Sequence, residues 1–241
     1  MRTKSIYLVL ASICGLLSSC DYEHVSAKGE VTTRDLSLSG YNGLKVSNAF
    51  DVYLTFSETE EHISIEANDN LHDRIVVARE GDDLIIKLKR YTTIKGKPTL
   101  KAYISTKNIK DFNLSGASTV TLGDIWDTNK GKIELSGSSE FSGEINATHL
   151  DINMGGASKA DIYGNVESLY ADLSGASDLR DYDLISERLN IELSGASEAF
   201  LSAQESIDID ASGASVLNYK GDAVINHKKL NGSSRLKNRN Q

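Results

Sequence analysis

The sequence predicts an all-β fold, a parallel β-helix built from coils of about 20 residues. A phrase of small residues, Ser-Gly-Ala-Ser or a close variant, occurs seven times, and its central glycines are separated by 21, 19, 19, 20, 18 and 19 residues. The flanking residues alternate between apolar and polar, which is the period of a β-strand and not of a helix. A fixed period near 20 residues is typical of a solenoid, whose coils close their core only by stacking. We expect the winding to be right-handed.

The seven phrases are interpreted as structural corners of the coils. Leading into each glycine, mostly aliphatic residues stand two, four and six positions before it, and an apolar residue stands four positions after it. The glycine and the second serine share this parity, so we expect both to face inward where only a small side chain fits. A buried serine hydroxyl needs partners, which neighbouring hydroxyls or turn carbonyls can supply. The corner glycines are Gly116, Gly137, Gly156, Gly175, Gly195, Gly213 and Gly232.

The regular coils are expected at residues 111–236, within one β-helical domain at 31–236. Residues 31–110 alternate less regularly, and "VSNAFDV" at 46–52 resembles a degenerate copy of the phrase with Asn48 at the glycine position. We expect wider coils there, or a strand layer continuous with the solenoid. The last repeat carries Lys228 at an aliphatic position, and the tail at 237–241 is basic, as a cap that blunts an open edge should be.

The first twenty residues form a targeting segment. Arg2 and Lys4 precede an apolar run at 6–17, which is too short to span a bilayer as a mature helix. The run ends in "LSSC", which resembles the lipobox of bacterial lipoproteins; a plain secretory signal is the alternative. We therefore predict a signal peptide at 1–19, lipidation of Cys20 and a tether at 20–30. Two or more acyl chains would give stable anchoring.

Charge and cysteine content exclude several classes of partner. Cleavage before Cys20 removes Arg2 and Lys4 and changes the net charge from −8 to −10. A protein this acidic is a poor candidate for binding nucleic acid, because the phosphate backbone is also negative. Cys20 is then the one mature cysteine, so neither a disulfide nor a cysteine metal site is expected. No cofactor motif occurs. We expect contact with the membrane through the lipid on Cys20, and an envelope protein or glycan as ligand.

No catalytic residue is predicted. The phrase lacks the strand-to-helix elbow of a serine hydrolase, and seven copies of a nucleophile make little sense. No metal-binding spacing occurs among the five histidines, which are interpreted as isolated surface residues: His24, His62, His72, His149 and His227.

One row of acidic residues is a candidate cation site. Asp172, Glu192 and Asp210 stand three residues before consecutive corner glycines, so their carboxylates would stack at roughly 4.8 Å. A divalent cation could relieve their repulsion through oxygen ligands. A solvated acidic stripe that protects the surface from aggregation is the favoured interpretation.

The motifs also resemble a known bacterial family. "GLKVSNAFDVYL", the repeated "LSGAS", and "NYKGDAVI" followed by "NGSSRL" are similar to the family named "putative auto-transporter adhesin, head GIN domain" over about residues 30–236. The resemblance implies a β-helical protein of the Gram-negative envelope, secreted or lipid-anchored, with adhesion suggested by the family name. It supplies no catalytic residue. Ala223 stands where members often carry proline, which affects only the local turn.

Three classes of function follow, in order of preference. The first is a non-catalytic, adhesin-like envelope lipoprotein of the outer membrane, on its cell-surface or periplasmic side, that binds through the outer faces of the solenoid. The second is a structural module that self-associates. The third is a polysaccharide-cleaving enzyme, which would need clustered acids with basic or aromatic partners.

Overall fold

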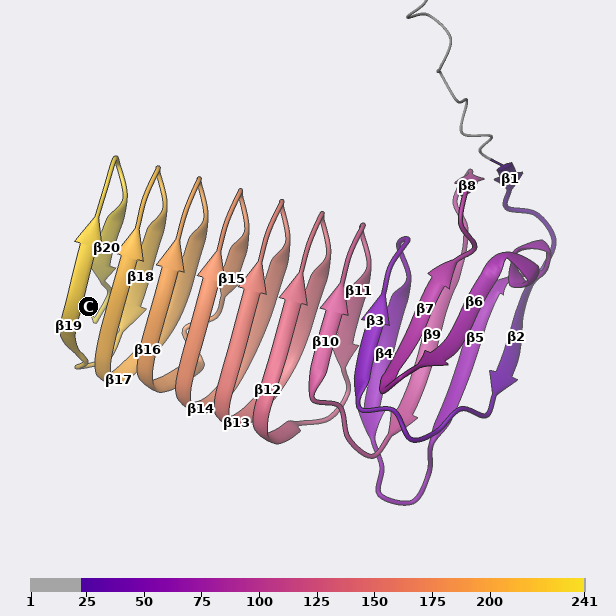
Figure 1. The fold of residues 1–241 in the computed structure, drawn as a ribbon, viewed down its shortest axis with the longest axis horizontal. Coiled ribbons are helices and arrows are strands. Elements are labelled where there is room, and N and C mark those ends of the chain that lie inside the picture. The colour runs from indigo at the N-terminus through magenta and orange to yellow at the C-terminus, as the bar shows by residue number, and fades with distance from the viewer. Residues whose placement is uncertain (1–22, 241) are drawn as a thin grey trace, which may run out of the picture.

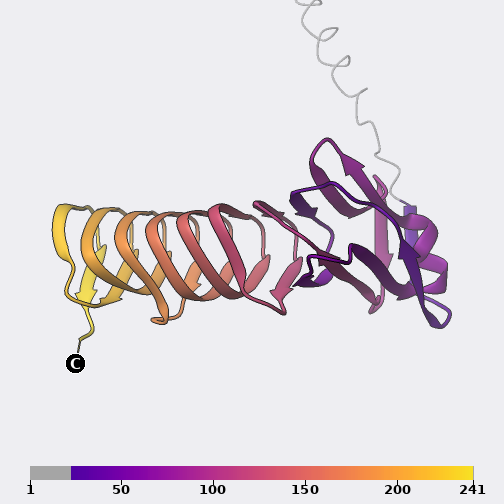
Figure 2. The same ribbon diagram turned by 90° about the horizontal axis from the view of Figure 1, so that it is seen from below.

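The chain forms an elongated β-solenoid with a strand layer at its N-terminal end (Figure 1). The structure, a computed structural model, describes residues 23–240. The all-β prediction and the solenoid are confirmed. Seen from below, the coils stack in one row and the N-terminal layer covers one end of that row (Figure 2).

Each coil has two faces that meet at the Ser-Gly-Ala-Ser turn. Strands of the first face lead into the turn: β3 (Gly43–Val46), β10 (Asp111–Leu114), β16 (Leu184–Leu193), β19 (Val224–Leu230) and the C-terminal part of β12 (Trp126–Leu135). Strands of the second face leave it: β4 (Asp51–Phe56), β11 (Thr119–Leu122), β15 (Asp178–Arg180), β18 (Val216–Lys220) and β20 (Arg235–Asn238). Three long strands start on the second face and continue into the first face of the next coil: β13 (Glu140–Met154), β14 (Lys159–Leu173) and β17 (Glu198–Ala211).

Neighbouring coils pair in parallel, with equivalent residues opposite one another. Ile133 pairs with Ile152, which in turn pairs with Ala171, and the same row continues through Ile191 and Ile209. Each of these side chains is fully buried. Because the side-chain period of a strand is two, this register keeps the whole apolar set of every coil inside. The stacked aliphatic rows form one continuous core.

The N-terminal segment is a strand layer and not a set of wider coils. Strands β3 and β4 form the first coil, and β7 (Asp83–Leu88) and β9 (Leu100–Thr106) pair with them in parallel. Beyond these, β6 (Ile75–Glu80), β5 (His62–Asn68) and β2 (Val31–Leu36) are antiparallel, with the short 3-10 helix η1 (Asp69–Arg74) between β5 and β6. Both faces of the solenoid therefore end in antiparallel strands, which cover the core at this end.

The segment expected to be a tether contains a strand. Residues Glu23–Ser26 form β1, which pairs in parallel with β8 (Thr92–Lys95). The Arg74 guanidinium also contacts the Glu23 carboxylate. Residues 20–22, including Cys20, lie outside the described residues.

An aromatic cluster lies where the strand layer meets the regular coils. Trp126 is 1% exposed, and its ring meets that of Phe112 edge-on with centroids 4.8 Å apart. Phe112 in turn meets Phe141 at 5.0 Å. The indole N–H of Trp126 donates to the Ile109 carbonyl at 2.7 Å, which satisfies the one polar atom of a buried ring.

Candidate functional site

The seven repeated turns lie along one edge of the solenoid. Their glycines all have φ between +70° and +77°, the left-handed region in which glycine carries no steric penalty. A Cβ built on Gly195 would stand 2.5 Å from the carbonyl oxygen of Gly175 in the preceding coil. The glycines are exposed at the turn and do not point inward as expected. They are needed for backbone conformation and for the close approach of one turn to the next.

The degenerate first copy meets the same requirement with different residues. Asn48 and Ala49 have φ of 68° and 61°, and asparagine tolerates this region better than most residues. The Asn48 side-chain oxygen also accepts a hydrogen bond from the Leu88 main chain at 3.1 Å. Asn48 thus holds the corner and ties it to the strand layer.

The second serine of each phrase is buried, with the sole exception of Ser234 in the last coil, which is half-buried. In five of the seven copies its hydroxyl has two carbonyl partners, and that of Ser197 lies 3.0 Å from the Ser194 carbonyl and 3.3 Å from the Leu173 carbonyl of the preceding coil. Ser139, Ser177, Ser215 and Ser234 bond in the same way. The partners are turn carbonyls and not neighbouring hydroxyls. Hydroxyls that donate to main-chain carbonyls hold the turns together, and none of these is hydrogen-bonded to a base that would activate it.

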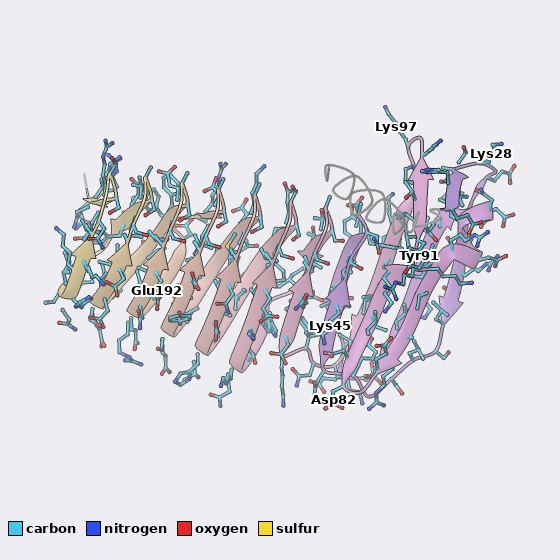
Figure 3. The ribbon with its side chains drawn as sticks, turned by 45° about the horizontal axis from the view of Figure 1, so that its top comes forward. Lys28, Lys45, Asp82, Tyr91, Lys97 and Glu192 are labelled. Carbon is cyan, nitrogen blue, oxygen red and sulfur yellow. The ribbon has the colours of Figure 1, made fainter. Side chains whose placement is uncertain are left out.

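The acidic row forms as the sequence spacing indicates, on the outer surface of the first face. Asp172 pairs with Glu192, and Glu192 pairs with Asp210, in successive strands; Figure 3 shows Glu192 on this surface. The Tyr170 hydroxyl lies 3.2 Å from Glu192, and the His227 imidazole lies 3.3 Å from Asp210. Partial burial, followed by the charges of Glu192 and Asp151, raises the pKa of Asp172.

Within residues 23–240, no group of three or more His, Cys, Asp or Glu side chains is arranged to hold a metal ion. The acidic row lines a shallow groove of about 340 Å³ together with Ser194, Ser212 and Lys229. The row is therefore a charged stripe that contacts Tyr170 and His227 and has Lys229 at its edge.

One histidine differs from its expected place. His72, in η1, is 7% exposed, and its Nε2 lies 3.0 Å from the Thr32 hydroxyl and 3.1 Å from the Thr32 carbonyl. The interpretation of all five histidines as surface residues was wrong here, because antiparallel pairing of β2 with β5 covers this position. His62 contacts Asp35 at 3.3 Å.

Comparison with known proteins identifies the family. The family model "Putative auto-transporter adhesin, head GIN domain" matches residues 40–223. The chain belongs to this family. The resemblance in the sequence motifs is thereby confirmed. No curated protein matches the chain.

Solved structures share the fold of this GIN domain. A "putative adhesin" from Bacteroides fragilis has a TM-score of 0.81 and 20% identity, and the match covers 89% of this chain and 100% of that one. A "putative adhesin" from Parabacteroides distasonis has a TM-score of 0.75 and 16% identity, covering 89% and 100%. A "putative lipid binding protein" from the same species has a TM-score of 0.74 and 18% identity, covering 90% and 100%.

Two grooves of the GIN domain could not be seen in the sequence. One, of about 800 Å³, follows the bend where the second face continues into the first; it is lined by Asp127, Asn146, Asn165, Ile185, Glu187 and Glu205 among others. The other, of about 940 Å³, lies where the strand layer meets the coils and is lined by Lys107, Lys110, Lys130, Asp111 and Asp127 among others. Both are open, and both depend on which strands become neighbours.

A pair of exposed tyrosines was also missed. Tyr53 of β4 and Tyr103 of β9 are 44% and 38% exposed, and their rings stack with centroids 5.4 Å apart and an interplanar angle of 15°. They are opposite each other in the parallel pairing of β4 with β9, which the sequence did not reveal. Alternation alone could have marked both as outward.

Proposed function

We propose that the protein is a non-catalytic envelope lipoprotein whose GIN domain binds a partner through the outer surfaces of the solenoid. The proposal rests on one observation: in each coil the repeated residues build the scaffold, whereas the residues that face outward vary. The repeated glycines and serines contact main-chain atoms of neighbouring coils, and the repeated aliphatic residues form the core. The outward positions differ from coil to coil, and variable side chains on a rigid scaffold suit recognition.

The family supports the same class of function. Its description and two of the structural neighbours above refer to adhesins, which are proteins of the cell surface. A self-associating structural module and a polysaccharide-cleaving enzyme stay as alternatives. No described residue pair combines a nucleophile with a hydrogen-bonded base at the repeated turns, so the geometry there supports binding rather than cleavage.

The binding proposal is tested with the soluble chain of residues 21–241, which retains every described residue. Incubated with an array of glycans and envelope proteins, it is expected to retain specific ligands without altering them. New reducing ends or unsaturated products from an array polysaccharide, formed by homogeneous protein, would establish an enzyme instead.

Membrane attachment is proposed to depend on Cys20. Within residues 23–240, no helix has the length and apolar character needed to cross a bilayer. Changing Cys20→Ala in the full chain should move the protein from the membrane fraction to the soluble fraction, since acyl chains would no longer be added. A variant that still sediments with membranes would show that the anchor lies elsewhere. Protease treatment of intact cells would distinguish the cell-surface from the periplasmic side.

A further inference from the structure

Charge is strongly segregated along the solenoid. Residues 23–110 carry thirteen Lys and Arg and thirteen Asp and Glu, so the strand layer is neutral. Residues 111–219 carry five Lys and Arg against nineteen Asp and Glu, a net charge of −14. Residues 220–240, which contain the last coil, reverse this with six Lys and Arg against one Asp, a net charge of +5. We call this last segment the basic end.

The cations of the basic end form no salt bridges, although Lys229 lines the groove of the acidic row. Of the eighteen Lys and Arg at residues 23–219, ten form a salt bridge: Arg34, Lys45, Arg74, Arg79, Lys87, Lys101, Lys132, Lys159, Arg180 and Arg188. None of the six at residues 220–240 does so. Lys220 instead stands over the Tyr182 ring, and Arg239 donates to Asn218. Six cations against a single carboxylate, with no salt bridge among them, create a local positive potential that attracts an anion.

The cations point in several directions around the coil. Lys229 is opposite Asp210 on the first face, and Arg235 and Lys237 are opposite Val216 and Asn218 on the second face. Lys228 takes the position at which the preceding coil carries the buried Ile209, yet it is exposed at the open end of the core. A flat, rigid partner could reach only one of these sides, whereas a flexible chain can reach all of them.

The open edge itself is poorly suited to accept another strand. Within the described chain, β19 pairs only with β17, and β20 pairs only with β18. A register shift between Ile207 and Asp208 interrupts the pairing of β19 with β17. Lys228 follows this shift, opposite the inward-facing Ile209. Bulges and inward charges are devices that prevent edge-to-edge pairing. A ligand at this end must therefore be held by side chains rather than by main-chain addition.

We infer that the basic end is a binding site for an acidic polysaccharide, a flexible chain with repeated carboxylate or sulfate groups. Lys228, Lys229, Arg235 and Lys237 would contact its anionic groups, and amide and hydroxyl side chains nearby, such as Asn231 and Ser233, would contact its hydroxyls. The segment has no Phe, Tyr or Trp, so it lacks the aromatic anchors typical of membrane-inserting faces. The acidic coils behind it repel polyanions and restrict binding to the end.

The position of the basic end fits this role. It lies at the opposite end of the molecule from β1 (Figure 1). If the chain is anchored through Cys20, the basic end is remote from the membrane and accessible to polymers outside the cell. The inference thus rests on the proposed binding function and names its ligand class.

The test compares two variants with the same change in charge. The first replaces Lys228, Lys229, Arg235 and Lys237 by glutamine in the soluble chain of residues 21–241. The matched control replaces Lys97, Lys107, Lys110 and Lys130, which also form no salt bridge and are exposed. Probes are heparin for sulfate, polygalacturonate for carboxylate and dextran as a neutral polymer, at low and high salt. Far-ultraviolet circular dichroism checks that each variant folds.

The wild type is expected to bind heparin or polygalacturonate but not dextran, and to bind less tightly as salt is raised. The first variant should lose about tenfold or more in affinity, while the control keeps that of the wild type. Equal loss in both variants would overturn the inference, because the site would not be the basic end. Self-association of the wild type at low salt, lost in the first variant and without polyanion binding, would identify a second copy as the occupant and also overturn it. If no polyanion binds but the array yields another ligand, the inference fails while the proposed function stands.

Discussion

Replacing Gly195 by alanine is expected to destabilise the chain by several kcal/mol, although the change adds a single methyl group. A left-handed backbone costs alanine about 1–2 kcal/mol relative to glycine. At φ +72° the new Cβ would also stand 2.5 Å from the Gly175 carbonyl oxygen, which is main chain and cannot turn aside. Overpacking of this kind typically adds about 1–3 kcal/mol. Valine, with its branched Cβ, should cost more.

Gly81 supplies a matched control for this prediction. It has φ +64° in the turn between β6 and β7, and a Cβ built on it would meet nothing within 4 Å. Gly81→Ala therefore has the backbone cost without the contact, and both changes reduce the entropy of the unfolded chain alike. Urea unfolding should show Gly195→Ala to be less stable than Gly81→Ala by about 1–3 kcal/mol. Equal stabilities would mean that the turns do not depend on close stacking.

Replacing Trp126 by alanine should produce a loss of about 3–5 kcal/mol in the free energy of unfolding. The ring is fully buried between Phe112 and the backbone of Gly131, where a Cβ would stand 2.7 Å from the indole Cη2 atom. A cavity of this size, beside main chain that is held by its pairing with β13, cannot easily collapse. Unfolding followed by far-ultraviolet circular dichroism measures the effect.

The intermediate variant Trp126→Phe separates packing from hydrogen bonding. It keeps an aromatic ring against Phe112 but leaves the Ile109 carbonyl without the indole donor. The expected cost is about 1–3 kcal/mol, below that of alanine. If Trp126→Ala were as stable as the wild type, the junction between strand layer and coils would not depend on this cluster.

The regular coils could be predicted in detail because their information is local and repeated. The spacing of the glycines gives the coil length, and the alternation around Ile133, Ile152 and Ile191 gives the inward face and the register. The sequence did not show why the turns require glycine. Parity placed Gly195 inside, whereas the turn exposes it and requires it for its positive φ.

The strand layer and the surface features of the solenoid depend on contacts between distant residues. Nothing near Tyr53 in the sequence indicates that Tyr103 stacks on it, and the antiparallel addition of β2, β5 and β6 follows no repeat. Only the structure shows that the Lys and Arg side chains at residues 220–240 form no salt bridges. The sequence shows their positive charge, which predicts a cap that protects the open edge.

If the Ser-Gly-Ala-Ser phrases are scaffold, ligands bind elsewhere on the surface of the solenoid. The decisive measurement is the affinity of Ser194→Ala and Ser197→Ala for the ligands that the soluble wild-type chain retains on the array. Ser194→Ala should be within about 0.5 kcal/mol of wild-type stability, and Ser197→Ala should be less stable because it loses its bonds to the Ser194 and Leu173 carbonyls. Both folded variants are expected to bind with wild-type affinity. Loss of binding in either variant, with its free energy of unfolding unchanged, would show that the phrase is a binding site and not a scaffold.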